Sequence, residues 1–223
     1  MQPTLAVIDI DIHAGQDEIA REGLLEHLSN SHDQCITPLW VNWLRERADL
    51  RVVCLVDDLR RFDDFLVDVI RTVPGVRGTS ARLAFDGVVC VDALMDIADE
   101  GALWDRRAAA TVEVKTQPGS DREVFEALVR LPKHKEVEVV WVFKTLHSTE
   151  ADLMLLLLGE RTAALTGYTM SWVRTTPGVI DTQVTTVLDW QVLGQSDDFL
   201  ALAERFPESA PCRQTEAVPA AAA

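Results

Sequence analysis

The segment IRTVPGV at residues 70–76 returns as VRTTPGV at residues 173–179, displaced by 103 positions. The same displacement relates ADL at residues 48–50 to ADL at residues 151–153. Near the start of each copy the displacement becomes 104, which indicates one residue gained or lost in the first helix or its loops. Self-similarity held in register over such a distance is the signature of a repeat. The chain is therefore a tandem fusion of two copies of one module.

Each copy predicts the order strand, helix, strand, strand, helix, strand. The first strand alternates Ile8, Ile10 and Ile12 with polar side chains, which is typical of a strand with one buried face. The second helix carries one apolar stripe at helical spacing, formed by Leu59, Phe62, Phe65, Leu66, Val69 and Ile70. This helix ends before Pro74, because proline disfavours the helical conformation of the residue that precedes it.

This order of elements is that of the ferredoxin-like fold, a four-stranded antiparallel sheet with both helices on one face. In the second copy the third strand, LMLLLL at residues 153–158, is apolar on both faces, whereas a sheet wetted on one side alternates. The other copy is the obvious cover for the open face. The predicted fold class is α+β, with two ferredoxin-like βαββαβ modules packed face to face or closed into an intramolecular pseudo-dimeric α/β barrel.

The repeat also predicts the domain boundaries. They are a first module over residues 1–86, a connector over 87–108, a second module with a C-terminal helix over 109–206, and a disordered tail over 207–223.

Charge and composition exclude several classes of function. Acidic residues outnumber basic ones, 36 to 21, for a net charge of −15. Because DNA affinity comes largely from Lys and Arg that neutralise phosphates, we expect no direct nucleic-acid binding. No apolar run is long enough to cross a bilayer, and the N-terminus lacks signal-peptide features, so we expect no membrane partner and no export. Four scattered cysteines favour a reducing cytoplasm, with no disulfide framework and no zinc site.

The Arg-Thr-x-Pro-Gly-Val pattern that closes the second helix, with Thr three residues on, resembles the effector-binding (RAM) module of the Lrp/AsnC regulators. The segment 172–188 is the closer match, and Asp49 and Asp152 at the start of the third strands also fit. The resemblance covers most of both modules. It implies a dimeric α/β barrel that binds amino acids or related small molecules near subunit interfaces. The family's helix-turn-helix has no counterpart here, since the first strand is predicted to begin at about residue 5.

Several residues are candidates for ligand binding. His147 lies in the turn between the second and third strands, where the resemblance places the effector. Asp49 and Asp152 recur at one place in both copies. A carboxylate there commonly caps backbone N–H groups, and ligand contact is the alternative that the resemblance suggests. Trp40 and Trp43 pack in the core or an interface, or they wall an apolar pocket.

A polar row projects from one face of the first strand. It consists of Asp9, Asp11 and His13, and Glu113 and Lys115 align with the two acids in the second copy. If the apolar face packs on the helices, this row points between the two sheets, where charges must be paired, hydrated or functional. An Asp-x-Asp pair near a His could ligate a divalent metal or act as general acid and base. The alternative is a hydrated lumen or a salt bridge between modules, such as Asp11 with Lys115.

These observations support three functions. The first is a protein that senses a small, amino-acid-like molecule, of the Lrp/AsnC effector-domain type but without its own DNA-binding domain. The second is an enzyme acting on a small organic substrate between the two sheets, with Asp9, Asp11 and His13 as catalytic residues. The third is an assembly module. The expected partners are a small-molecule ligand and either further copies of the chain or a partner regulator. No cofactor or metal is assigned, and any pocket is expected to be lined unequally by the two copies.

Overall fold

The computed structural model describes residues 4–30, 35–45, 48–99, 108–132, 134–146 and 151–206. The first module contains β1 (Thr4–Ile12), α1 (Asp17–Ser29), β2 (Ile36–Arg45), β3 (Leu50–Val56), α2 (Leu59–Phe65) with a π-helical turn η1 (Leu66–Ile70), and β4 (Val76–Val89). The second contains β5 (Ala108–Thr116), α4 (Asp121–Val129), β6 (Val137–Leu146), β7 (Leu153–Gly159), α5 (Thr162–Tyr168) with η3 (Thr169–Val173), and β8 (Val179–Val192). Each module is followed by one more helix, α3 (Val91–Asp99) or α6 (Ser196–Arg205).

The eight strands form one closed antiparallel barrel in the order β1-β3-β2-β8-β5-β7-β6-β4. Each module contributes a four-stranded sheet, and the two sheets join at both edges. The joins are possible because β4 and β8 are long, with 14 residues each. The first half of β4 pairs with β1 of its own module, and its second half pairs with β6 of the other. The predicted fold class is therefore confirmed, and of the two packings considered the barrel is the one observed.

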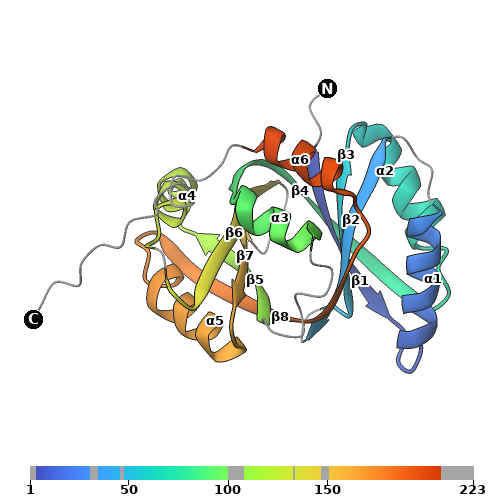
Figure 1. Cartoon of the computed structure of the whole chain (residues 1–223), viewed down its shortest axis with the longest axis horizontal. Helices are drawn as coiled ribbons and strands as arrows, with labels where there is room; N and C mark the ends of the chain where they lie inside the picture. The colour runs from blue at the N-terminus through green and yellow to red at the C-terminus, as the bar shows by residue number, and fades with distance from the viewer. Residues whose placement is uncertain are drawn as a thin grey trace, which may run out of the picture.

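Alternation along the strands separates the barrel interior from the helix-covered outside. On β1, Leu5 and Val7 belong to the core that fills the interior, whereas Ile8 and Ile10 pack with α1 and α2. Figure 1 shows the helices of the two modules on opposite sides of the molecule, with α3 and α6 between them over the middle. Both helices add apolar side chains to the interior core, so they cover one end of the barrel.

A stack of aromatic rings fills the interior where the modules meet. Trp40 stacks on Trp141 with ring centroids 5.1 Å apart, and also on Trp190 and Phe199. Trp40 and Trp141 are equivalent residues, each the fifth of its strand and each directly after a bulge. The repeat therefore brings its own two copies of one tryptophan into contact, and Trp40 lies in the core, one of the two positions expected for it.

At each of the two joins of the barrel, a large side chain lies opposite a small residue. At the β2–β8 join a small Asn42 lies opposite Trp190, and at the β4–β6 join a large Phe143 lies opposite Gly87. A Cβ built on Gly87 would lie 2.0 Å from Cδ1 of Phe143, so glycine is required there by packing. Because interiors are close-packed, each join has one large and one small partner.

Some boundaries and one cysteine differ from expectation. β4 runs to Val89, three residues past the expected end of the first module, and β5 begins at Ala108. Cys54 is a free thiol, and burial raises its pKa to about 12. Cys90 is disulfide-bonded, which the expectation of a chain without a disulfide framework did not include. The predicted tail, 207–223, lies outside the described residues.

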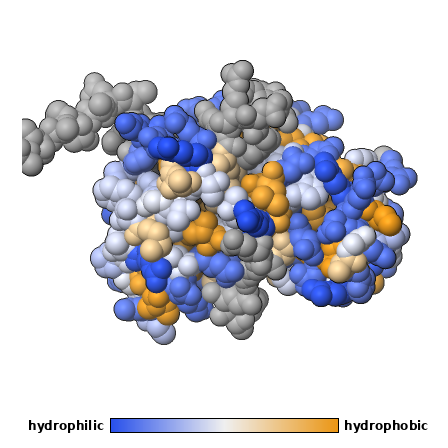
Figure 2. Space-filling view, turned by 90° about the horizontal axis from the view of Figure 1, so that it is seen from below, coloured by the Kyte–Doolittle hydropathy of each residue, from blue (hydrophilic) through white to orange (hydrophobic). Residues whose placement is uncertain are grey.

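The outer surface is mixed in character. On the face shown in Figure 2, hydrophobic residues form separate patches between hydrophilic ones. Within the described ranges, no helix is long and apolar enough to span a bilayer.

The packing at Gly87 yields the first prediction. Gly87→Ala should lower the free energy of unfolding, measured by urea denaturation, by about 2 kcal/mol, because the new methyl group overpacks the core against Phe143. Gly167→Ala is the matched control. It lies in helix α5 with no atom within 4 Å of the added Cβ, and it should be neutral or stabilising. Equal effects of the two substitutions would refute this explanation of Gly87.

Candidate functional site

The polar row of β1 meets its counterpart from β5 inside the barrel. Asp9 accepts hydrogen bonds from Arg51 (Nε to Oδ1, 2.6 Å) and from Arg82. Glu113 of the second module accepts from Arg82 at 2.7 Å and from Arg51 at 3.2 Å. Arg51 also donates to Thr111 at 2.6 Å. All five side chains are buried, so two arginines and two carboxylates form one closed ion cluster across the module boundary.

The two modules contribute unequally to this cluster. Asp9 and Glu113 are equivalent residues, but both arginines come from the first module. At the position equivalent to Arg51, the second module has Met154, in β7. Burial by itself would lower the pKa of Arg51, but the attraction of Asp9 and Glu113 outweighs it and raises that pKa. The cluster carries no net charge, which is how buried charges are tolerated.

The other members of the row do not join this cluster. Asp11 is half-buried and lies 3.6 Å from Arg77, and His13 is exposed. Lys115 pairs with Asp152 at 2.9 Å, so the salt bridge suggested between Asp11 and Lys115 is not formed. The structure thus separates the proposed catalytic residues Asp9, Asp11 and His13, one inside the barrel and two toward its end.

The side chains of the two repeated aspartates, Asp49 and Asp152, accept hydrogen bonds from backbone N–H groups. Asp49 accepts a hydrogen bond from the backbone N–H of Ile12 at 2.6 Å. Asp152 accepts from the backbone N–H of Thr116 at 2.8 Å, in addition to Lys115. Burial opposes ionisation of Asp152, but these hydrogen bonds and Lys115 together lower its pKa. Both contacts tie the start of the third strand to the end of the first.

Two predicted ligand-binding residues remain, Trp43 and His147. Trp43 is half-buried under the guanidinium of Arg21, 4.2 Å from the ring centroid, which is a cation–π contact on the outside of the barrel. His147 lies outside the described residues.

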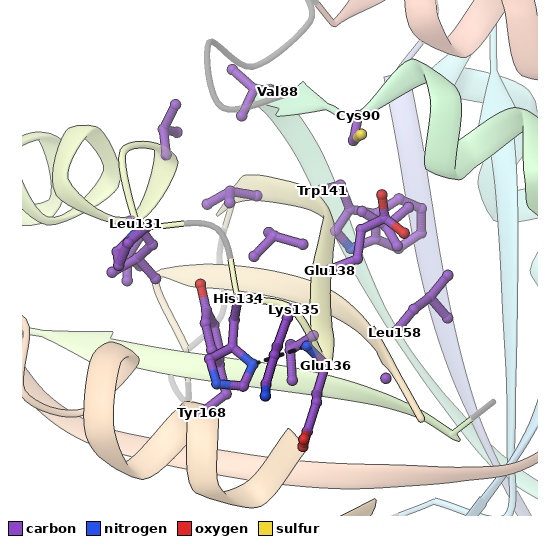
Figure 3. A pocket seen from close by; sticks show the side chains of 18 of the residues that line it. Val88, Cys90, Leu131, His134, Lys135, Glu136, Glu138, Trp141, Leu158 and Tyr168 are labelled. Carbon is purple, nitrogen blue, oxygen red and sulfur yellow. Dashed lines mark hydrogen bonds between the residues drawn. The ribbon is translucent and has the colours of Figure 1, made fainter. Parts of the chain in front are cut away.

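A pocket of about 460 Å³ lies beside the start of β6, and Trp141 of the aromatic stack is among its lining residues. Its walls come from the end of α4, the loop to β6, the end of β7, α5 and the start of α3 (Figure 3). The apolar lining includes Val88, Leu128, Val129, Leu131, Val137, Val139, Trp141 and Leu158. The polar lining includes Asp92, His134, Lys135, Glu136, Glu138, Glu160 and Tyr168. The size is ordinary for a small-molecule site.

The pocket exists because α4 is shorter than its counterpart. The equivalent helix α1 has 13 residues and α4 has 9, a difference of about one turn or 6 Å of helix. In the first module the extra turn carries the buried Leu28. In the second, Pro132 follows the helix closely and disfavours the helical conformation at Leu131. The loop that replaces the lost turn forms the pocket rim.

Three of the polar lining residues, His134, Lys135 and Glu136, lie on that loop. His134 stands edge-on to Tyr168, with ring centroids 5.9 Å apart, and its Nδ1 accepts a hydrogen bond from the backbone N–H of Glu136 (Figure 3). Nδ1 is therefore unprotonated in this bond. Glu138 lies on the other side of the pocket from His134 (Figure 3). No group of three His, Cys, Asp or Glu side chains in the described residues is arranged to hold a metal ion.

The sequence predicted a site between the two sheets, whereas this pocket lies beside the start of β6. The residues that line the pocket do not recur at a fixed spacing in the sequence, so no sequence motif predicted them. Pro132 was the available signal, because a proline near the end of the first helix in one copy only predicts unequal helices. The lining residues of this pocket come from the second module and the segment around Cys90. The prediction of a pocket between the sheets, lined unequally by the two copies, stays a prediction.

Comparison with known proteins defines the class of the fold. No family model and no curated protein matches the sequence. Among solved structures, a "putative monooxygenase" from Fusobacterium nucleatum aligns over 86% of this chain and 95% of its own, at 11% identity and a TM-score of 0.56. An anthrone oxidase-like protein aligns over 87% and 95%, at 11% and 0.55. The siroheme decarboxylase NirDL aligns over 90% and 77%, at 10% and 0.53. The chain therefore has the dimeric α+β barrel fold, with both halves in one polypeptide.

The resemblance to Lrp/AsnC effector modules is wrong. The neighbours that cover most of this chain bear the names of enzymes. A transcriptional regulator from Neisseria meningitidis aligns over only 36% of the chain, at a TM-score of 0.30, which is too little to support kinship. The motif misled because any βαββαβ module must end its second helix before a strand, and Pro-Gly does so through general backbone chemistry.

The ion cluster yields the second prediction. Arg51→Met, which installs the residue of the second module, should lower the free energy of unfolding by about 3–5 kcal/mol, since it leaves an uncompensated buried carboxylate. Adding Glu113→Gln should recover part of this loss. Arg21→Met, which breaks an exposed pair with Asp189, is the control and should cost under about 1 kcal/mol. Urea denaturation measures all three, and a small effect of Arg51→Met would contradict the role of the cluster.

Proposed function

We propose that this protein is an enzyme that acts on a small, neutral and mainly apolar organic molecule held in the pocket beside β6. The observation that carries the proposal is the pocket itself, a cavity with apolar walls and several polar groups, which is the usual form of a small-molecule site. The enzyme names of the structural neighbours add support, although a shared fold does not fix a function.

The barrel interior is a poor alternative. Its middle is filled by the stacked rings of Trp40, Trp141 and Trp190, and its polar part by the buried ion cluster. A substrate there would have to displace one or the other. We propose that Asp9 and Glu113 hold the modules together and do not perform chemistry.

The charge of the lining favours a neutral ligand. Three carboxylates, those of Asp92, Glu136 and Glu160, line the pocket with one lysine, Lys135, among the described residues. Arg161 compensates one of them, at 3.5 Å from Glu136. An anionic molecule would therefore meet net repulsion.

The lining also holds groups that can move a proton. His134 and Glu138 are of the residue types that act as general acid or base near neutral pH. They lie on different sides of the pocket, so a bound molecule can contact either of them (Figure 3). The chemistry within reach is proton removal from a weakly acidic carbon or hydroxyl, which prepares an apolar substrate for attack by a second reactant.

Anthrone is a suitable first substrate because it is flat, neutral and apolar and bears an acidic CH₂ group. Reaction with one O₂ gives anthraquinone and one H₂O, so oxygen uptake and quinone absorbance report the same event. We expect the protein to accelerate this reaction over buffer. Val139→Trp, which fills the pocket from a half-buried strand position, should remove at least nine-tenths of the acceleration.

Ile19→Trp is the matched control for added bulk. Ile19 is 55% exposed on α1, far from the pocket lining, and this variant should retain the full rate. A rate equal to that of buffer, together with no binding of anthrone, would contradict the proposal. So would a Val139→Trp protein that is as active as the parent.

A further inference from the structure

Tyr168 is the only tyrosine of the chain, and its hydroxyl lacks a hydrogen-bond partner in the described structure. The side chain is 3% exposed and lines the pocket. In Figure 3 its oxygen-bearing end rises beside His134 toward Leu131. Its hydroxyl oxygen does not belong to the buried side-chain atoms that lack a partner, so it is open to the pocket. A tyrosine hydroxyl that opens onto a cavity and bonds no described protein group is available to donate to a molecule that enters the cavity.

The first module provides an internal comparison. The residue equivalent to Tyr168 is Phe65, the last residue of α2 and also buried. There the longer α1 supplies the extra helical turn that α4 lacks. The fold thus needs only an aromatic ring at this position. The hydroxyl occurs in the module that has the pocket.

We propose that the Tyr168 hydroxyl donates a hydrogen bond to a neutral oxygen acceptor on the ligand, and that the ligand class is an apolar molecule bearing a carbonyl group. This inference rests on the proposed function and adds the polar group by which the site recognises its substrate. A carbonyl oxygen accepts without carrying charge, so it satisfies the hydroxyl and avoids repulsion by the surrounding carboxylates.

The protonation state suits a donor. Burial raises the pKa of Tyr168 to about 12, because the phenolate would lose hydration. The hydroxyl therefore keeps its proton throughout the neutral and mildly alkaline range. The groups nearest the ring along the loop are His134 and Glu136, and the Glu136 carboxylate pairs with Arg161.

The test compares two ligands that differ in one group. Fluorenone carries a carbonyl group, and fluorene has CH₂ at the same place on the same tricyclic body. Affinities are measured by equilibrium dialysis for the parent protein and for Tyr168→Phe, which restores the residue of the first module. We expect the parent to bind fluorenone about threefold to tenfold more tightly than fluorene. Tyr168→Phe should remove this preference and leave fluorene binding unchanged.

A second measurement locates the contact. Replacing tyrosine biosynthetically by fluorotyrosine gives a single fluorine NMR signal, since the chain has one tyrosine. Fluorenone should shift this signal more than fluorene at equal saturation. Equal affinities of the parent for both ligands, or an unchanged preference in Tyr168→Phe, would overturn the hydrogen bond and leave the pocket proposal standing. Failure of both ligands to bind would overturn the pocket proposal as well.

Discussion

The buried ion cluster of Asp9, Arg51, Arg82 and Glu113 is the constraint on which the rest of the molecule depends. Neither module can neutralise it alone: the first would bury two arginines with one carboxylate, and the second one carboxylate with no arginine. Closing the barrel is the arrangement that satisfies all four charges without water. With the aromatic stack it also fills the interior, which is why we propose a ligand site outside the barrel core.

Duplication left the two modules free to specialise outside that core. The first module keeps a full-length α1 whose last turn packs the buried Leu28. The second module ends α4 a turn earlier, ahead of Pro132, and the space becomes a pocket. The change costs little free energy of folding, because it affects a helix end and a loop and leaves the strand register intact. Asymmetry in one helix thus converts a structural repeat into a barrel with one candidate site.

The sequence predicted the repeat, the βαββαβ order and the inward face of Asp9 and Glu113, because strand alternation and repeat register are local properties. It did not predict which basic residues pair with those acids. Arg51 and Arg82 are brought to them by the pairing of β3 and β4 with β1, and these strands are distant in the chain. The pocket was missed for a similar reason. Its residues are joined by tertiary packing, and the one local signal, Pro132, marks where a helix ends without showing that the gap stays open. The family resemblance failed because Pro-Gly-Val reports helix termination, which unrelated modules share.

The central claim is that a single small-molecule site lies in the second module, outside a filled barrel. A crystal structure of the protein grown with fluorenone tests it most directly. We predict density for one ligand between β6 and the loop after α4, with its oxygen toward Tyr168 and the Trp40–Trp141 stack undisturbed. Density inside the barrel with the tryptophans displaced, or at the corresponding place in the first module beside Phe65, would contradict the claim.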